Sequence, residues 1–128
     1  MKRIKPKDFY LDLPCSVVSI GCASETLHGS FDYGKIKVFS EIASANDNYA
    51  TLRSVNGEIR KLFNVRKYVY FKRTDRVTLK EMCERLKTKD GFNAIVCVLG
   101  HFLYVHNNTY YSFFNNEDDK VVAMWLLD

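Results

Sequence analysis

Residues that interrupt regular structure are scarce in this chain. Its 128 residues include only two prolines and six glycines, and neither an internal repeat nor a Pro/Gly-rich linker is present. Because boundaries between domains usually fall in such linkers, we expect a single domain over residues 1–128. The hydrophobic content of 47% and aromatic content of 14% are enough for that domain to bury a core and offset the entropy of ordering.

Long apolar runs are also missing. None approaches the roughly 20 residues that a membrane-spanning helix needs. Residues 1–7 are basic, but the apolar stretch at 9–11 is soon interrupted by Asp12 and Pro14 instead of extending into the core of a signal peptide. We therefore expect no membrane segment and no secretory signal.

Cysteine is present at four positions without the spacing of a metal site. Cys15, Cys22, Cys83 and Cys97 form no CxxC pair, and His28 is not grouped with them as a ligand would be. Cys83 and Cys97 lie within apolar patterns, where a free cysteine acts as a small hydrophobe. We expect four reduced thiols in a reducing, cytoplasmic compartment, no disulfide framework, and no metal or cofactor.

Helical signals fall in the first two-thirds of the chain. Pro14 stands where helices begin, and Thr78 with Glu81 forms a capping box. Hydrophobic spacing and these signals predict helices at 15–23, 39–45, 49–63 and from 79 to the Asp90-Gly91 stop, with loops in the rest of 24–48.

Strand signals dominate the last third. Apolar or alternating segments predict strands at 67–72, 93–99, 101–106, 109–114 and 121–127. Asn107 and Asn108 tolerate the positive φ that a two-residue hairpin turn demands. The expected fold class is α+β, with N-terminal helices packed on a C-terminal antiparallel β-meander.

Two residues in this arrangement could carry chemistry. Cys15 opens a helix, and both a helix N-terminus and a nearby histidine lower the pKa of a thiol. His101 follows a buried strand and a glycine, and could act as the base. Taken alone, each residue is more often part of a core than of a catalytic site, so the interpretation depends on the two occurring together.

At this point the chain resembles small papain-like cysteine peptidases, particularly phage- and bacterium-encoded ones such as the NlpC-like group. The resemblance covers residues 9–127 and is carried by a cysteine opening a helix, a TLKE-type helix, and the segment GFNAIVCVLGHFLYVHNNTYYSFF at 91–114. It implies Cys15 as nucleophile and His101 as general base in cleavage of an amide bond, with a peptide or protein substrate. It also implies that the chain acts in the cytoplasm, including that of an infected host, or in a virion.

The third residue, which would orient His101, stays open between Ser112 and Asn116. If Asn107 and Asn108 form the turn, strand alternation places Ser112, Phe114 and Asn116 on the same face as His101. Members of the resembled family usually carry Asp or Asn in this role.

The sequence leaves two alternative functions open. An inactive papain-like fold could serve as a viral structural or protein-binding module, using the aromatic side chains of the meander: Phe102, Tyr104, Tyr110, Tyr111, Phe113 and Phe114. The basic cluster at 66–76 could bind nucleic acid, but its charges alternate with aromatics as in an ordinary edge strand, so we rank nucleic acid last.

Overall fold

The computed structural model describes residues 1–45 and 51–128. Its helices are α1 (Cys15–His28), α2 (Lys37–Ala45), α3 (Leu52–Leu62) and α4 (Leu79–Leu86), with three short 3₁₀ helices, η1 (Asp8–Tyr10), η2 (Tyr33–Lys35) and η3 (Arg73–Asp75). Its strands are β1 (Lys2–Ile4), β2 (Val65–Tyr70), β3 (Asn93–Val98), β4 (His101–His106), β5 (Thr109–Tyr111) and β6 (Val121–Leu127). The α+β class is confirmed.

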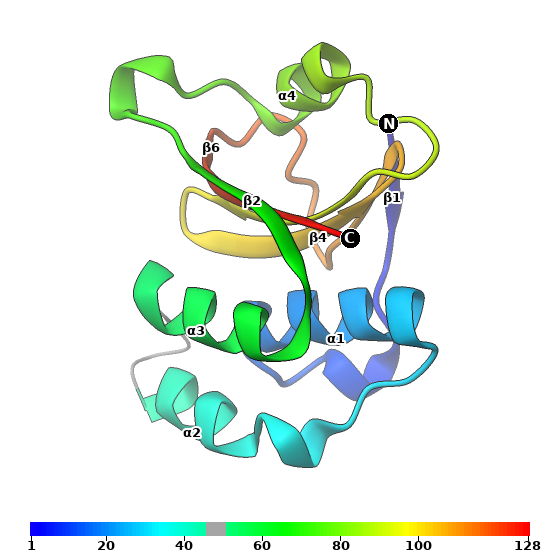
Figure 1. Ribbon diagram of the computed structural model, residues 1–128, viewed down its shortest axis with the longest axis vertical. Coiled ribbons are helices and arrows are strands. Elements are labelled where there is room, and N and C mark those ends of the chain that lie inside the picture. The colour runs from blue at the N-terminus through cyan, green and yellow to red at the C-terminus, as the bar shows by residue number, and fades with distance from the viewer. Residues whose placement is uncertain (46–50) are drawn as a thin grey trace.

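All six strands join one sheet, in the order β1-β5-β4-β3-β6-β2. The β3–β4 and β4–β5 pairs are consecutive antiparallel hairpins, and the predicted pairing of Val105 with Tyr110 is confirmed. β6 runs antiparallel between β3 and β2. As Figure 1 shows, α1 and α3 lie against one side of this sheet and α4 lies on the other.

The finer expectation, helices at the N-terminus packed on a C-terminal meander, is only partly right. β1 and β2 come from the first two-thirds of the chain and form the two edges of the sheet. β1 pairs in parallel with β5, so the sheet is mixed. The other neighbour of β5 is β4, and β6 pairs with β3 instead of continuing the meander beside β5. α4 follows β2 in the chain, so the helices are not all N-terminal.

α1 begins at the residue that the sequence indicates and ends later than expected. Pro14 is its N-cap, so Cys15 is its first residue. The helix continues through residues 24–28, where we expected a loop, and stops at Gly29, whose φ of 79° suits glycine. Leu27 packs on the core, which extends the apolar face by one turn beyond the predicted end.

The other predicted elements form with shifts of a few residues. α2 and α3 confirm the helices expected near 39–45 and 49–63, although residues 49 and 50 fall outside the described part of the chain. Thr78 accepts a hydrogen bond from the Glu81 N–H at 3.2 Å, which confirms half of the capping box, whereas the Glu81 carboxylate pairs with Arg85. β2 starts two residues earlier than predicted, and β3, β4 and β6 match closely.

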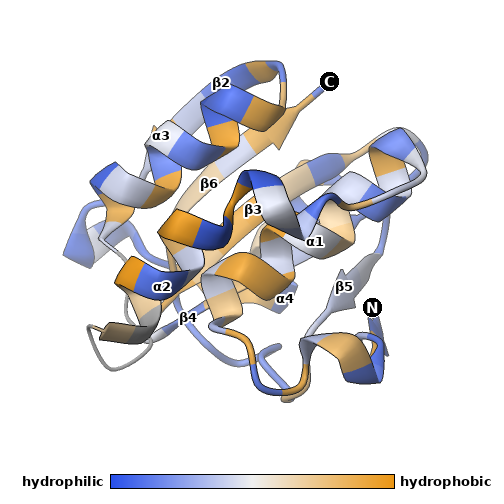
Figure 2. Ribbon diagram, turned by 90° about the horizontal axis from the view of Figure 1, so that it is seen from below, coloured by the Kyte–Doolittle hydropathy of each residue, from blue (hydrophilic) through white to orange (hydrophobic). Residues whose placement is uncertain are grey.

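The sheet has a core on each side. The larger one lies under α1 and α3 and contains Trp125, whose indole N–H donates to Asn56 of α3 at 3.0 Å. The smaller one lies under α4 and contains Leu79, Met82 and Cys83. Figure 2 looks at the sheet from the side of α1, α2 and α3 and shows polar and apolar residues alternating around these helices. None of the described helices has the length and apolar character that crossing a bilayer requires.

Candidate functional site

Cys15 opens into a cavity at the start of α1. The cavity has a volume of about 360 Å³ and lies between the segment preceding α1 and the ends of β4 and β5. Its wall includes Leu11, Leu13, Cys15, His101, Ser112 and Phe114. The structure therefore brings together Cys15, His101 and Ser112, which are far apart in the sequence, because α1 packs directly across β4.

Burial and backbone amides act in opposite directions on the Cys15 thiol. Burial raises its pKa, while backbone N–H groups of Phe102, Ser16 and Cys15 itself lower it in part. Ser16 and Cys15 belong to the first turn of α1, where backbone N–H groups have no partner within the helix. The net rise is opposite to the lowered pKa expected from the sequence, because desolvation outweighs the helix start while His101 is neutral.

The remaining thiols are less accessible than Cys15. All four cysteines are free, but Cys15 is half-buried and the other three are buried. Burial raises the pKa of Cys22 and of Cys97 to about 12, and that of Cys83 to about 11. The cysteine in the cavity is therefore the one placed to react.

His101 is the first residue of β4. The residue before it, Gly100, has a left-handed backbone conformation. Gly100 has a φ of 77°, a conformation that side chains disfavour, and it turns the chain from β3 into β4. The ring of Phe114 packs edge-on against the imidazole with the ring centres 5.7 Å apart. The backbone N–H that reaches Cys15 belongs to Phe102, so the sulfur lies beside the main chain that carries His101.

A chain of hydrogen bonds holds the Nε2 side of the imidazole. His101 Nε2 lies 3.1 Å from Ser112 Oγ, the Ser112 hydroxyl donates to Asn116 Oδ1 at 2.5 Å, and the Asn116 amide donates to Asp119 Oδ2 at 2.7 Å. Ser112 and Asn116 are both buried. The two candidates for the third residue thus act in series, with Ser112 touching His101 and Asn116 behind it.

The direction of these bonds fixes the tautomer of His101. A carboxylate accepts only, so Asp119 orients the Asn116 amide to present its oxygen to Ser112. The Ser112 hydroxyl donates its single proton to that oxygen, and its own oxygen already accepts a hydrogen bond from the Phe114 N–H at 3.1 Å. It can therefore meet Nε2 only as an acceptor, so Nε2 carries the proton and Nδ1 keeps a lone pair. A lone pair at Nδ1 is what a general base requires.

The same serine explains why β5 is shorter than predicted. The sequence indicates a strand to residue 114, but β5 ends at Tyr111. The Phe114 N–H turns back onto Ser112 Oγ, a local side-chain contact that competes with strand pairing. The chain bends here, and the Phe114 ring packs on His101 while its backbone no longer pairs with β4.

Asp119 belongs to the site, and sequence reasoning missed it. Its carboxylate raises the pKa of His101, against the burial that lowers that pKa more strongly. The predicted loop at 115–120 holds acidic residues at 117, 118 and 119, and alternation along a strand could not single one out. A carboxylate three residues after Asn116, within reach of its amide in a tight turn, was the one available signal.

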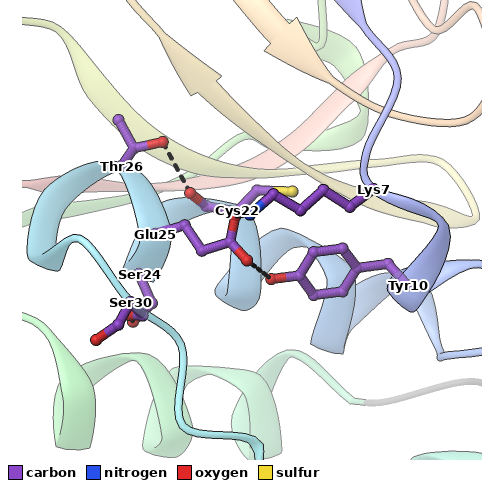
Figure 3. Close-up of polar contacts among 7 residues, drawn as sticks. All are labelled: Lys7, Tyr10, Cys22, Ser24, Glu25, Thr26 and Ser30. Carbon is purple, nitrogen blue, oxygen red and sulfur yellow. Dashed lines mark hydrogen bonds and ion pairs between the residues drawn. The ribbon is translucent and has the colours of Figure 1, made fainter.

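The segment that forms the other wall of the cavity is anchored to α1. Tyr10 is 1% exposed, and its hydroxyl donates to Glu25 Oε1 at 2.8 Å, while Lys7 pairs with Glu25 Oε2 at 3.0 Å. Figure 3 shows this cluster at the C-terminal half of α1. The Tyr10 ring lies directly over Gly21, where a Cβ would come within 2.5 Å of the ring. These contacts fix the course of the chain from Leu11 to Cys15.

The structure also locates the residues of the two alternative functions. Of the six meander aromatics, Phe102, Tyr104 and Tyr110 are buried, and Phe114 is 64% exposed at the mouth of the cavity. β2, which carries Arg66, is an edge strand as predicted. Within residues 1–45 and 51–128, no three His, Cys, Asp or Glu side chains are grouped as metal ligands.

Comparison with known proteins assigns no family. No protein-family model, no curated protein and no solved structure matches this chain at a significant level. The geometry of the cavity is therefore the feature that indicates a function.

Proposed function

We propose that the chain is a papain-like cysteine peptidase or amidase that cleaves an amide bond with Cys15 and His101. The observation that carries the proposal is the shared cavity, which is lined both by the half-buried Cys15 thiol and by a histidine whose tautomer leaves Nδ1 free to accept a proton. The hydrogen-bond chain supports the role of base, because it fixes the ring and stabilises its protonated form.

In the first half of the reaction His101 Nδ1 takes the proton from Cys15 Sγ as the sulfur attacks the carbonyl carbon of the substrate. The negative charge that develops on the carbonyl oxygen is stabilised by backbone N–H groups at the start of α1. When the C–N bond breaks, the imidazolium returns the proton to the leaving amine, and a thioester remains on Cys15.

In the second half His101 Nδ1 accepts a proton from water, whose oxygen attacks the thioester carbonyl. The carbon–sulfur bond breaks, the carboxylic acid leaves, and the proton returns to the thiolate. Ser112, Asn116 and Asp119 touch no reacting atom, and each acts through the orientation and charge of His101. Because burial raises the pKa of Cys15, the resting pair is a neutral thiol and a neutral imidazole.

Hydrolysis in ¹⁸O-labelled water tests the proposal. The full chain is incubated with a mixture of peptides, and the products are read by mass spectrometry for new carboxyl termini that carry one ¹⁸O from water. We expect such termini with the wild type, and none with Cys15→Ala or His101→Ala. Cys83→Ala, which removes a thiol remote from the cavity, should retain them. If no peptide is cleaved, or if cleavage survives in Cys15→Ala, the proposal is wrong.

The second candidate is a papain-like fold that binds a protein partner without cleaving it. The observation that favours it is the apolar rim of the cavity, where Leu11 is 59% exposed and Phe114 is 64% exposed. Exposed apolar groups beside a concave site are typical of a contact surface. In that case Leu11→Ser and Phe114→Ser would weaken binding, and Cys15→Ala would leave it intact.

A further inference from the structure

A second hollow borders the same turn between β3 and β4 that lines the candidate cavity. Gly100 and His101 line the cavity, while Leu99, the residue before them, lines a hollow of about 570 Å³. The remaining wall of this hollow consists of Arg73, Thr74, Arg76 and Lys120. The Leu99 N–H donates to the Lys120 carbonyl at 3.1 Å, which holds the turn against the start of β6.

Three cationic residues line this hollow, and none of them forms an ion pair within the described residues. The ion pairs that form in the described part of the chain involve Lys7, Lys61 and Arg85. Arg73 and Lys120 are exposed, and Arg76 is half-buried. Cations gathered around a concave surface focus a positive potential there and attract anions.

Arg76 is held in place before any ligand arrives. Its Nε donates to the Phe71 carbonyl at 3.0 Å, a terminal nitrogen donates to the Tyr70 hydroxyl at 3.1 Å, and the guanidinium lies 5.7 Å from the centre of the Tyr70 ring. A guanidinium has five N–H groups, so three remain after these two contacts. A fixed guanidinium with free N–H groups binds planar oxyanions well, since the ordering of its side chain is already complete.

We propose that the hollow is an anion-binding subsite that holds a carboxylate of an acidic peptide whose neighbouring amide bond lies at Cys15. Arg76 accepts the carboxylate as a fixed fork, and Arg73 and Lys120 close on it from the exposed side. This inference rests on the proposed function, because it names the class of peptide that the cavity takes. A carboxylate fits better than a nucleic-acid backbone because the cations surround one hollow, while Arg66 lies on the edge strand β2.

Binding to a variant that cannot turn over separates the subsite from the chemistry. The full chain carrying Cys15→Ala is titrated into two fluorescein-labelled peptides, and anisotropy is measured at low salt. One peptide has a central leucine flanked on each side by two glutamates, and the other has glutamines in their place. We expect the acidic peptide to bind about tenfold more tightly, as one charge-assisted bidentate contact predicts.

Three substitutions with the same charge change test whether that preference belongs to the hollow. Arg76→Gln should reduce the preference to about twofold or less, whereas Arg66→Gln, on the edge strand, should retain it. Arg73→Gln, at an exposed position, should lower the preference in part. It provides a second test of the hollow in case the Arg76 variant misfolds. The inference is overturned if both peptides bind equally, if the Arg66 and Arg76 variants lose the same amount, or if a dT oligonucleotide displaces the acidic peptide more effectively than unlabelled peptide does.

The same peptides distinguish the two proposals in the active chain. If the wild type cleaves neither peptide but the Arg76-dependent preference is present, the subsite stands and the peptidase proposal fails. If it cleaves both at the same rate and binds both equally, the peptidase proposal stands and the subsite fails.

Discussion

At the level of single residues, the proposed chemistry depends on the protonation state of His101. Burial lowers its pKa below the usual value near 6.5, and Asp119 raises it in part. At a pH above the pKa of His101 in both the folded and the unfolded chain, the ring is neutral and Nδ1 can accept a proton. In the window below 6.5 the unfolded chain binds the proton more readily than the folded chain, so the free energy of unfolding falls as the pH falls through it.

Asp119→Asn tests the hydrogen-bond chain behind His101. Removing the charge takes away the interaction that raises the pKa of His101, so that pKa should fall further below its wild-type value. NMR titration of the His101 ring protons reads this directly. Asp118→Asn, at the exposed neighbouring position, removes the same charge and should leave the titration unchanged. A rise in the pKa of His101, or equal shifts in the two variants, would contradict the chain.

At the scale of single elements, the close approach of Tyr10 to α1 positions the cavity wall. Within a helix, glycine usually lowers the free energy of unfolding relative to alanine, by roughly 0.5–1 kcal/mol. Gly21 in α1 is an exception, because a Cβ would lie 2.5 Å from the Tyr10 ring and force it away from Glu25.

Two glycine substitutions in helices should therefore have opposite effects. Gly21→Ala should lower the free energy of unfolding by about 1–3 kcal/mol, as overpacking does. Gly57→Ala, in the middle of α3 with nothing within 4 Å of its Cβ, should raise it by about 0.5–1 kcal/mol. Urea unfolding measures both. If Gly21→Ala stabilises the chain as Gly57→Ala does, Tyr10 does not pack on α1 as described.

Local signals predicted most elements, and contacts between distant segments account for the errors. Pro14, the capping box at Thr78 and the Asn107 turn are local, and each lies where expected. The pairing of β1 with β5 joins residues more than a hundred positions apart, so no local pattern could show it. Asp119 was missed for a related reason, since its role exists only once Ser112 and Asn116 have folded against His101.

In the whole molecule, the sheet lies between the two cores and connects them. Each strand of its centre contributes side chains to both faces, for example Ile95 to the larger core and Val96 to the smaller one. Neither core can come apart while the central strands remain paired, so we expect one cooperative unfolding transition.

Trp125 provides the measurement of that cooperativity. It is the single tryptophan and is fully buried in the larger core, so its fluorescence reports the α1 side of the sheet. Far-UV circular dichroism reports all helices, including α4 on the other side. The two transitions in urea should have the same midpoint. Separate midpoints would mean that the α4 side unfolds as an independent unit.

The central claim is that the Cys15 thiol and His101 form a reactive pair, and alkylation by iodoacetamide tests it most directly. Mass spectrometry of the peptides gives the rate at each of the four cysteines over a range of pH. We expect Cys15 to react faster than Cys22, Cys83 and Cys97, and His101→Ala to slow Cys15 near neutral pH, because the thiol loses the base that takes its proton. Labelling of Cys15 no faster than that of Cys83, or unaffected by His101→Ala, would contradict the account.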